Sequence, residues 1–349
     1  MKIAIIPGDG IGPEVINEGI KVLDVIKNKL ILDIKLDLKN WGANEWLKTG
    51  IGLPENALVN LSENYNAIYV GAFGDPRIPD MIHGREILLG LRFGLDLYVN
   101  IRPISIFDPI LCPLKNDKNI NFIILRENTE DSYVSIGGNF KKYTDNEVAI
   151  DESIHTRNGV ERIIRYAFEY AKNNKRKKIT LTDKSNAIQF GGSLWQRIFK
   201  KVSIEYPNID IEHLYIDVMA MELVRRPQEF DVIVTSNLFG DILSDLGAGL
   251  VGGLGLAASA NINPGRIGLF EPVHGSAPHI AGQGKANPMA AILTLGMMLD
   301  YLGITKAKLA IDHAIECAFK ERALTFDLGG TLSTSDMGNF ICKLIKEKL

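Results

Sequence analysis

The sequence is poor in residues that mark several specialised classes of protein. It has only three cysteines in 349 residues, Cys112, Cys317 and Cys342, and their wide separation excludes a disulfide framework and matches no metal-ligand spacing. The net charge of −3 lacks the basic excess of a nucleic-acid-binding protein. The most apolar long stretch, Leu246–Ala260, is too short and too rich in glycine to span a membrane. Asp9 interrupts the apolar N-terminus, so no secretion signal is expected there. We therefore expect a cytoplasmic protein that binds neither nucleic acid nor membrane.

What the sequence does have is the composition and pattern of a two-domain α/β protein. Apolar residues make up 46% and charged residues 23%, as in ordinary globular proteins, and the length favours two domains. Short apolar runs end in turn residues and precede helical patterns, which is typical of parallel strands that alternate with helices. The stretch 136–153 has no helical period and is expected to form an arm or hairpin. Strands are expected at 2–7, 67–73, 121–128, 177–186 and 230–237, and a helix at 13–29.

The first expected strand leads into a glycine-rich loop, PGDGIGPEV. Its glycines are Gly8, Gly10 and Gly12, whereas the dinucleotide-binding fingerprint needs a third glycine where this chain has Pro13. No Gly-Lys-Ser or Gly-Lys-Thr follows, which also excludes a P-loop. The residues alone leave two interpretations open, a structural turn and a loop that contacts a ligand.

Residues suited to acid–base and metal chemistry follow the expected strands, at the sheet edge where ligands of open α/β sheets bind. Asp241 and Asp245 are four residues apart, so in a helix their side chains share a face, roughly 5–6 Å apart. A hard divalent cation, Mg²⁺ or Mn²⁺, suits that pair; the alternative is two solvent-facing aspartates. Lys184 and Tyr133 are candidate proton carriers, against the commoner roles of a surface lysine and a packed tyrosine.

Three arginines indicate a ligand that carries carboxylate groups, and a glycine-rich loop near the C-terminus indicates a second, flat ligand. Arg92, Arg102 and Arg126 lie near apolar strand-like runs, and a guanidinium matches the carboxylate groups of a di- or tricarboxylic acid. The alternative for each is pairing with a structural acidic residue. The stretch 269–293 is dense in Gly, Pro, Ala and His, so a flat ligand can approach its backbone closely. Its two histidines, His274 and His279, lack a zinc spacing and are expected to contact that ligand or its phosphates.

Six segments together resemble one enzyme family. In chain order they are IPGDGIGPEV, LRFGLDLYVNIRP, RENTEDSY, TDKSN, NLFGDILSDLGAGLVGGLGLAASANI and EPVHGSAPHIAGQGKANP. In this order they are similar to the β-decarboxylating dehydrogenases, the family of isopropylmalate, isocitrate, homoisocitrate and tartrate/D-malate dehydrogenases. The resemblance extends from Lys2 to about Leu302, and the combination is specific although no single segment is.

The resemblance implies an α/β fold of two domains. This is the isopropylmalate-dehydrogenase-like fold with a parallel or mixed sheet, not a Rossmann fold, so the missing third glycine is expected. Residues 1–99 and 252–349 would form a discontinuous cofactor-binding domain. Residues 100–251 would form a substrate and dimerisation domain with an arm near 136–153. A homodimer or tetramer with active sites shared between subunits is also implied.

The resemblance further implies a role for each candidate residue. Tyr133 would protonate the enolate left after CO₂ departs, and Lys184 of a partner subunit would assist removal of the hydroxyl proton. Asp241 and Asp245 would hold Mg²⁺ or Mn²⁺, with Asp217 arriving from the other subunit. The substrate would contact Leu88, Leu89, Arg92, Arg102, Arg126 and Asp217. The nicotinamide cofactor would contact Ile11, Glu271, His274, Gly275, Ser276, Ala277, His279, Ile280 and Asn287.

Positions at which family members carry different residues indicate which substrate and which cofactor this chain uses. Leu88 and Leu89 fall where isopropylmalate dehydrogenases place leucines; they suit an isopropyl group and disfavour a third carboxylate. The favoured substrate is therefore 3-isopropylmalate, converted to 2-oxoisocaproate in leucine biosynthesis, with D-malate or tartrate, then isocitrate or homoisocitrate, as alternatives. His279 replaces the aspartate usual in NAD-dependent members, but residues that bind the 2′-phosphate of NADP are mostly missing, so NAD is favoured. The non-enzymatic alternative, a regulatory subunit, is disfavoured because the metal aspartates, the lysine and the tyrosine are all present.

Overall fold

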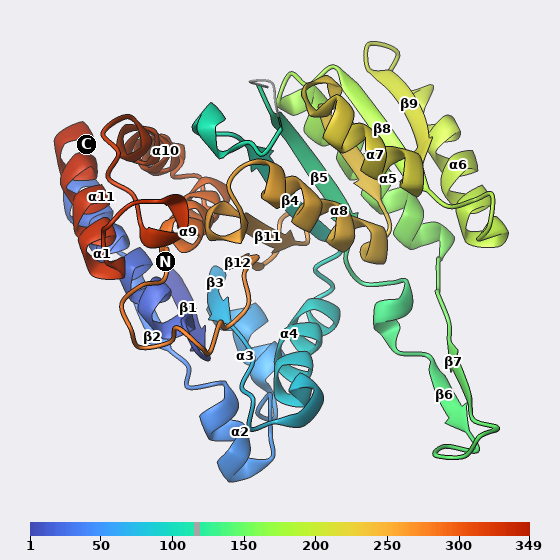
Figure 1. The fold of residues 1–349 in the computed structure, drawn as a ribbon, viewed down its shortest axis with the longest axis horizontal. Helices are drawn as coiled ribbons and strands as arrows, with labels where there is room; N and C mark the ends of the chain where they lie inside the picture. The colour runs from blue at the N-terminus through green and yellow to red at the C-terminus, as the bar shows by residue number, and fades with distance from the viewer. Residues whose placement is uncertain (115–118) are drawn as a thin grey trace. The chain divides into compact units, whose positions relative to one another are not determined.

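The computed structural model describes residues 1–114 and 119–349 (Figure 1). The chain forms two compact units. Unit 1 comprises Met1–Leu97, Ser105–Asp117 and Ala248–Leu349, and unit 2 comprises Tyr98–Ile104 and Lys118–Gly247. Because the chain enters each unit more than once, residues distant in sequence meet within one unit, and no linear boundary marks the division.

Unit 1 contains a five-stranded arrangement in which most neighbours are parallel. The strands lie in the order β2 (Lys35–Leu38), β1 (Lys2–Gly8), β3 (Ala67–Ala72), β12 (Gly268–Pro272) and β11 (Ala258–Ile262). Only β11 and β12 pair antiparallel; β1 pairs parallel with β2 and β3, and β12 with β3. Strands β3, β11 and β12 are buried at every residue, as expected for strands covered on both faces.

Seven α-helices cover these strands among the described residues of unit 1. Helix α1 packs on α11 and α9 packs on α10, and α9 also packs on β11 and β12. A separate apolar cluster includes Leu61 of α3, Ile87 and Leu91 of α4, and Val70 of β3. The helices are α1 (Gly12–Leu30), α2 (Ala43–Thr49), α3 (Ala57–Asn64), α4 (Ile82–Gly94), α9 (Met289–Tyr301), α10 (Thr305–Lys320) and α11 (Thr334–Lys348).

Unit 2 has its own run of strands. Their order is β4 (Val99–Ser105), β5 (Asn121–Glu127), β10 (Val232–Thr235), β8 (Lys178–Asp183) and β9 (Asp210–Tyr215). From β5 to β9 every pairing is parallel, so the carboxyl ends of these strands meet at one edge. The helices are α5 (Arg157–Asn173), α6 (Gln189–Ser203), α7 (Ile216–Arg225) and α8 (Asn237–Leu250).

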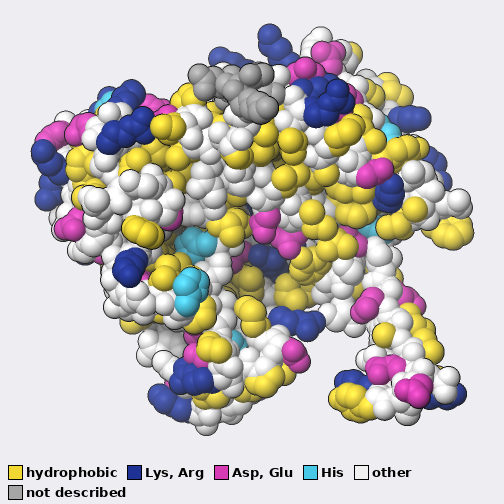
Figure 2. Space-filling view, viewed as in Figure 1, with side chains coloured by type: hydrophobic (Ala, Val, Ile, Leu, Met, Phe, Trp, Pro, Cys, Tyr) yellow, Lys and Arg dark blue, Asp and Glu magenta, His cyan; other side chains and the backbone are white. Residues whose placement is uncertain are grey.

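A two-stranded hairpin extends from unit 2 (Figure 1). Strands β6 (Gly137–Phe140) and β7 (Val148–Asp151) pair antiparallel, and all eight of their residues are exposed. Apolar side chains lie on this hairpin, with Phe140 64% and Ile150 56% exposed (Figure 2). An isolated two-stranded ribbon is only marginally stable in water, so these apolar side chains are suited to contact another surface.

The α/β fold class predicted from the sequence is confirmed, as are the expected strands that became β1, β3, β5, β8 and β10. Four expected strands end earlier than predicted; those expected at 67–73 and 121–128 each end one residue early, at Ala72 and Glu127. The strand expected at 230–237 ends at Thr235 because Asn237 already begins α8, and the strand expected at 177–186 ends at Asp183. Over the residues that the structure describes, no helix has the length and apolar character needed to cross a bilayer.

Candidate active site

Helix α8 begins directly after β10 and passes over Arg126 of β5. The parallel pairing of β10 with β5 sets Thr235 opposite Arg126, so the helix that follows β10 starts beside this arginine. Gly240 makes the close approach possible, because a Cβ atom there would lie 2.6 Å from Cβ of Arg126. Asp241 and Asp245 lie on this helix, as the sequence predicted, and their i, i+4 spacing puts them on one face.

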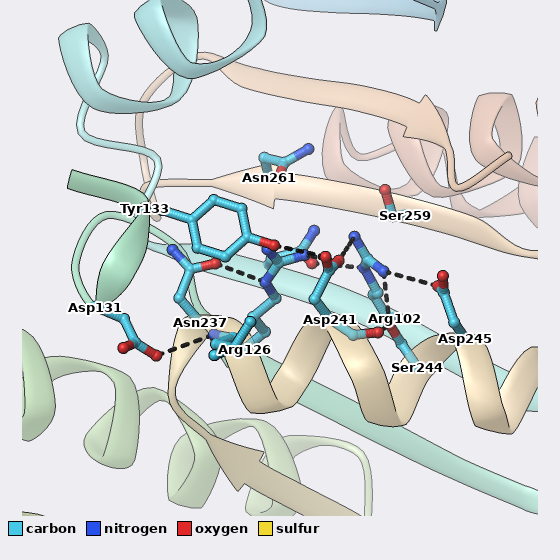
Figure 3. A network of polar contacts seen from close by, with 12 residues as sticks. Arg102, Arg126, Asp131, Tyr133, Asn237, Asp241, Ser244, Asp245, Ser259 and Asn261 are labelled. Atoms are coloured by element: carbon cyan, nitrogen blue, oxygen red, sulfur yellow. Dashed lines mark hydrogen bonds and ion pairs between the residues drawn. The ribbon is translucent and has the colours of Figure 1, made fainter. Parts of the chain in front are cut away.

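Asp241 is the centre of a network of polar contacts in unit 2 (Figure 3). The Tyr133 hydroxyl donates a hydrogen bond of 2.6 Å to Oδ2 of Asp241. Nη1 of Arg126 donates to Oδ1 of Asp241, and Nη2 of Arg102 lies 3.2 Å from the same oxygen. The Arg126 guanidinium also lies over the Tyr133 ring, 5.0 Å from its centroid. The structure thus brings together two predicted carboxylate-binding arginines, the predicted proton donor and a predicted metal ligand.

Asp245 lies one helical turn after Asp241, at the more open end of this network. Its Oδ1 lies 3.6 Å from Nη1 of Arg102, and that nitrogen also donates to Oγ of Ser244 at 2.6 Å. Burial raises the pKa of the Asp245 carboxyl; Arg102 lowers this pKa, and the negative charge of Asp241 raises it again. A carboxylate pair of this kind gains from a cation placed between its members.

The donor set on α8 fits a hard divalent cation. Carboxylate oxygens are the preferred ligands of Mg²⁺ and Mn²⁺, and Asp241 and Asp245 supply them on one face. Over residues 1–114 and 119–349, no group of three or more His, Cys, Asp or Glu side chains is arranged to hold a metal ion. Among the described residues, α8 therefore offers two carboxylates here, Asp241 and Asp245.

Lys184 and Asp217 form a second charged group in unit 2. The parallel register of β8 with β9 sets Asp183 opposite Tyr215, so the residues that follow each strand, Lys184 and Asp217, meet. Nζ of Lys184 donates a hydrogen bond of 2.7 Å to Oδ1 of Asp217, and this contact lowers the pKa of Asp217. A pocket beside the pair is lined by Lys184 and residues of other elements, among them Asp131. The structure thus joins these two predicted site residues to each other.

In unit 1, helix α4 carries the predicted substrate residues of that unit. Leu88 packs against the apolar cluster, and Leu89 is half-buried. One turn later, Arg92 is only 5% exposed, and its Nη2 donates to Oε1 of Glu271 at 2.7 Å. Nε of Arg92 is buried and has no hydrogen-bond partner. A buried donor without a partner costs free energy, and an anionic oxygen would satisfy it.

The two predicted cofactor loops of unit 1 contact each other. The backbone N–H of Ile11 donates to the carbonyl of Ser276 at 2.8 Å. Gly10 lies against the same carbonyl with φ +56°, and a Cβ atom there would be 2.0 Å from the oxygen. Gly10 of the opening motif therefore lets the two loops approach, which favours the interpretation as a close-packed turn.

The remaining predicted cofactor residues lie on or near the second loop. The His274 side chain is partly buried; burial lowers its pKa, which favours the neutral imidazole, and its Nε2 has no hydrogen-bond partner. The exposed His279 and the half-buried Ile280 follow a turn at Ala277. Asn287 is buried and donates to Asp327 at 3.0 Å, whereas Gly275 is exposed.

Sequence reasoning missed the polar residues that orient the arginines and the start of α8. Asn237 accepts a hydrogen bond from Nε of Arg126 at 2.8 Å, and Asn100 accepts one from Nε of Arg102 at 2.8 Å. Asp131, in the segment RENTEDSY, accepts from the backbone N–H of Leu238. The segments that contain Asn237 and Asp131 were recognised, but nothing local in them identifies these partners.

Comparisons with known proteins agree over nearly the whole chain. The family model described as isocitrate/isopropylmalate dehydrogenase matches residues 2–341. A protein named 3-isopropylmalate dehydrogenase from Thermobifida fusca is 44% identical over 352 residues, covering 100% of this chain and 98% of that protein. A protein of the same name from Streptomyces griseus is 45% identical over 326 residues, which cover 92% of this chain and 93% of that protein. The crystal structure of isocitrate dehydrogenase from Methylococcus capsulatus matches with a TM-score of 0.89 at 38% identity, covering 99% of each chain.

Proposed function

Because the chain belongs to the isocitrate/isopropylmalate dehydrogenase family, we propose that it converts 3-isopropylmalate to 2-oxoisocaproate by oxidative decarboxylation, in leucine biosynthesis. The family model and the relatives confirm the membership inferred from the motifs. Members are metal-dependent dehydrogenases that act on small hydroxy acids, and NAD use is typical of the family. Relatives at 42–45% identity that bear the name 3-isopropylmalate dehydrogenase support this substrate.

One observation supports 3-isopropylmalate above isocitrate. Helix α4 presents Leu88 and Leu89 one turn before Arg92, whose buried Nε has no hydrogen-bond partner. Leucine side chains gain about 0.8 kcal/mol for each CH₂ group that they bury, so an isopropyl group binds well beside them. A third carboxylate, as in isocitrate, would lose its hydration there without a partner. Arg92, on the same helix, would bind a carboxylate that the two acids share.

The polar network of unit 2 supplies orientation and the final proton. Arg102 and Arg126 are held by Asn100, Ser244 and Asn237, so their guanidinium groups are ordered before substrate binds. They would bind the substrate carboxylates and fix the geometry of the reacting carbon atoms. Asp241 and Asp245 would hold Mg²⁺ or Mn²⁺ with the partner subunit's Asp217. The bound ion supplies Lewis-acid polarisation of the substrate hydroxyl and the resulting carbonyl oxygen.

Two side chains carry the protons. During oxidation at C2, the partner subunit's Lys184 would assist removal of the hydroxyl proton, and the nicotinamide cofactor would accept the hydride, giving a β-keto acid. The carboxylate β to the new carbonyl leaves as CO₂, and its bond electrons form the enolate. Tyr133, whose hydroxyl donates to Asp241 at 2.6 Å, then protonates the enolate carbon.

NAD is the proposed oxidant. NADP binding would require cationic side chains around the 2′-phosphate. The positions concerned hold His279, Ile280, Phe326 and Gly330, which provide few such side chains, and this supports NAD. A homodimer with shared sites is also proposed. Its support is the exposed apolar hairpin of β6 and β7, and the two-carboxylate donor set on α8.

The proposal is tested by measuring kcat/KM for 3-isopropylmalate, D-malate, tartrate and isocitrate, each with NAD and with NADP, in the presence of Mg²⁺. We expect 3-isopropylmalate with NAD to give the highest value and to release one CO₂ per NADH formed. A higher value for D-malate or tartrate would replace the proposed substrate, and a higher value for isocitrate would refute the role given to the leucines. Absence of turnover with all four acids would favour a regulatory subunit.

A further inference from the structure

Asp131 has an unusual backbone conformation for a residue with a side chain. Its φ of 69° and ψ of −154° fall in a region that is almost restricted to glycine. Its side chain is nevertheless buried, with the residue 4% exposed. A strained non-glycine residue persists only where its surroundings hold it, and such residues concentrate at functional sites. The contacts of the side chain give the reason for its presence here.

The two carboxylate oxygens of Asp131 bind different parts of unit 2. Oδ1 accepts a hydrogen bond from the Ser132 N–H at 2.9 Å and one from the Ser153 hydroxyl. Oδ2 accepts the backbone N–H of Leu238 at 3.0 Å. The backbone N–H of Asp131 donates to the Ile154 carbonyl at 2.8 Å. One residue therefore joins its own turn, the chain that returns from the hairpin, and the start of α8.

The contact with Leu238 lies at the N-terminus of a 14-residue helix. The first backbone N–H groups of a helix have no acceptor within it, and a carboxylate placed there also interacts favourably with the helix dipole. Nδ2 of Asn237 donates to the Glu130 carbonyl at 3.1 Å, so the turn at 130–131 binds the first two residues of α8. Burial raises the pKa of Asp131, but hydrogen bonds from Ser153 and Leu238 lower it overall, which keeps the carboxylate charged.

The same turn and the same helix carry the proposed proton donor and a proposed metal ligand. Tyr133 follows Asp131 by two residues, and Asp241 follows Leu238 by three. The Tyr133 hydroxyl and Asp241 are joined by a 2.6 Å hydrogen bond. The turn and α8 are thus connected at both ends, by the contacts of Asp131 and Glu130 with Leu238 and Asn237 at one end and by that of Tyr133 with Asp241 at the other.

We propose that Asp131 is a positioning residue that sets the placement of Tyr133 relative to Asp241 by binding the N-terminus of α8. The chemical consequence rests on the proposed function, because that function gives Tyr133 and Asp241 their roles. The strain at Asp131 is explained by the same contacts, since glycine would suit the backbone but would leave Leu238 without its acceptor.

The test compares Asp131→Gly with the wild-type chain. Glycine relieves the backbone strain, so the Tm is expected to stay within about 4 °C of the wild-type value. Loss of the carboxylate is expected to lower kcat about 10–100-fold, as for other small displacements of catalytic groups, with KM for the acid changed less than about threefold. Asp131→Asn keeps one acceptor oxygen, so its kcat is expected to lie between those of the wild type and Asp131→Gly. Lys175→Gly, which changes an exposed residue at φ 56° in the same unit, is the matched control and should retain the wild-type kcat.

A second readout is independent of activity. Hydrogen exchange over the peptide 238–241 should be faster in Asp131→Gly, because the Leu238 N–H loses its acceptor, and unchanged in Lys175→Gly. Wild-type kcat in Asp131→Gly, or unchanged exchange in this peptide, would overturn the positioning role. If the wild-type chain turned over none of the four acids, the proposed function would fail, and the exchange comparison would still decide whether Asp131 orders the start of α8.

Discussion

The contact between the two predicted cofactor loops gives a prediction about Gly10→Ala. Gly10 has φ +56°, where an L-residue is strained, and its missing Cβ leaves room for the Ser276 carbonyl oxygen. An added Cβ would lie 2.0 Å from that oxygen, whereas real Cβ atoms essentially never come within 3.0 Å, so the loops must separate by about 1 Å. That separation lengthens the hydrogen bond from Ile11 to Ser276, which is 2.8 Å in the structure.

The expected cost is the sum of two terms. The left-handed backbone costs an alanine about 1–2 kcal/mol, and loss of the loop hydrogen bond costs about 1 kcal/mol. The free energy of unfolding should therefore fall by about 2–3 kcal/mol. Because Ile11 and Ser276 are both proposed cofactor contacts, NAD binding should also weaken, by about tenfold if 1.4 kcal/mol of contact is lost.

Gly50→Ala is the matched control. Gly50 also has positive φ, +69°, but nothing lies within 4 Å of the position of its Cβ. It should lose only the backbone term, about 1–2 kcal/mol, and keep the wild-type affinity for NAD. Urea unfolding and calorimetric NAD titration measure the two quantities. Equal destabilisation in both variants, with equal NAD affinity, would refute the reasoning.

Three further substitutions test separate parts of the account. Lys184→Ala should lower kcat by about 10²–10⁴, as measured in steady-state assays with 3-isopropylmalate, and a rate near that of the wild type would assign the proton transfer to another group. His279→Asp should increase the ratio of kcat/KM with NAD to kcat/KM with NADP, because a carboxylate accepts the ribose hydroxyl and repels a 2′-phosphate; an unchanged ratio would show that this position does not discriminate. Glu18→Gln should raise the Tm at pH 7 and lose this advantage as the pH falls below about 4.3, the ordinary carboxyl value. Burial raises the pKa of Glu18 in the folded chain, despite the ion pair with Lys21 at 2.8 Å. The wild type therefore loses stability as the pH rises through that pKa, whereas the glutamine of the variant does not titrate. A Tm difference independent of pH would contradict this explanation.

The local parts of the fold and site could be predicted from the sequence. The strand β1 and the helix α1 are visible as an apolar run followed by a glycine turn and a helical period, and β10 with α8 is visible as an apolar run followed by Ser236 and a helical period. The shared face of Asp241 and Asp245 needs only the helical repeat, because four residues make about one turn. These features depend only on residues close together in the chain, so the composition and periodicity of the sequence are sufficient to predict them.

The contacts that orient the site could not be predicted from residue patterns. Asp131 and Leu238 are 107 residues apart, and Arg92 and Glu271 are 179 apart. Their meeting depends on the order of strands, for example on β12 lying beside β3, and no local pattern specifies that order. The positive φ of Asp131 could not be predicted either, because a positive φ is normally expected only at glycine.

The central claim is that α8 holds the divalent ion at which the hydroxy acid is oxidised. Titration of Mn²⁺ followed by electron paramagnetic resonance, in the presence of 3-isopropylmalate, tests it most directly. The wild-type chain and the exposed-site control Asp300→Asn should each bind one Mn²⁺ per chain, and Asp241→Asn should lose that binding. Wild-type Mn²⁺ affinity in Asp241→Asn would contradict the account.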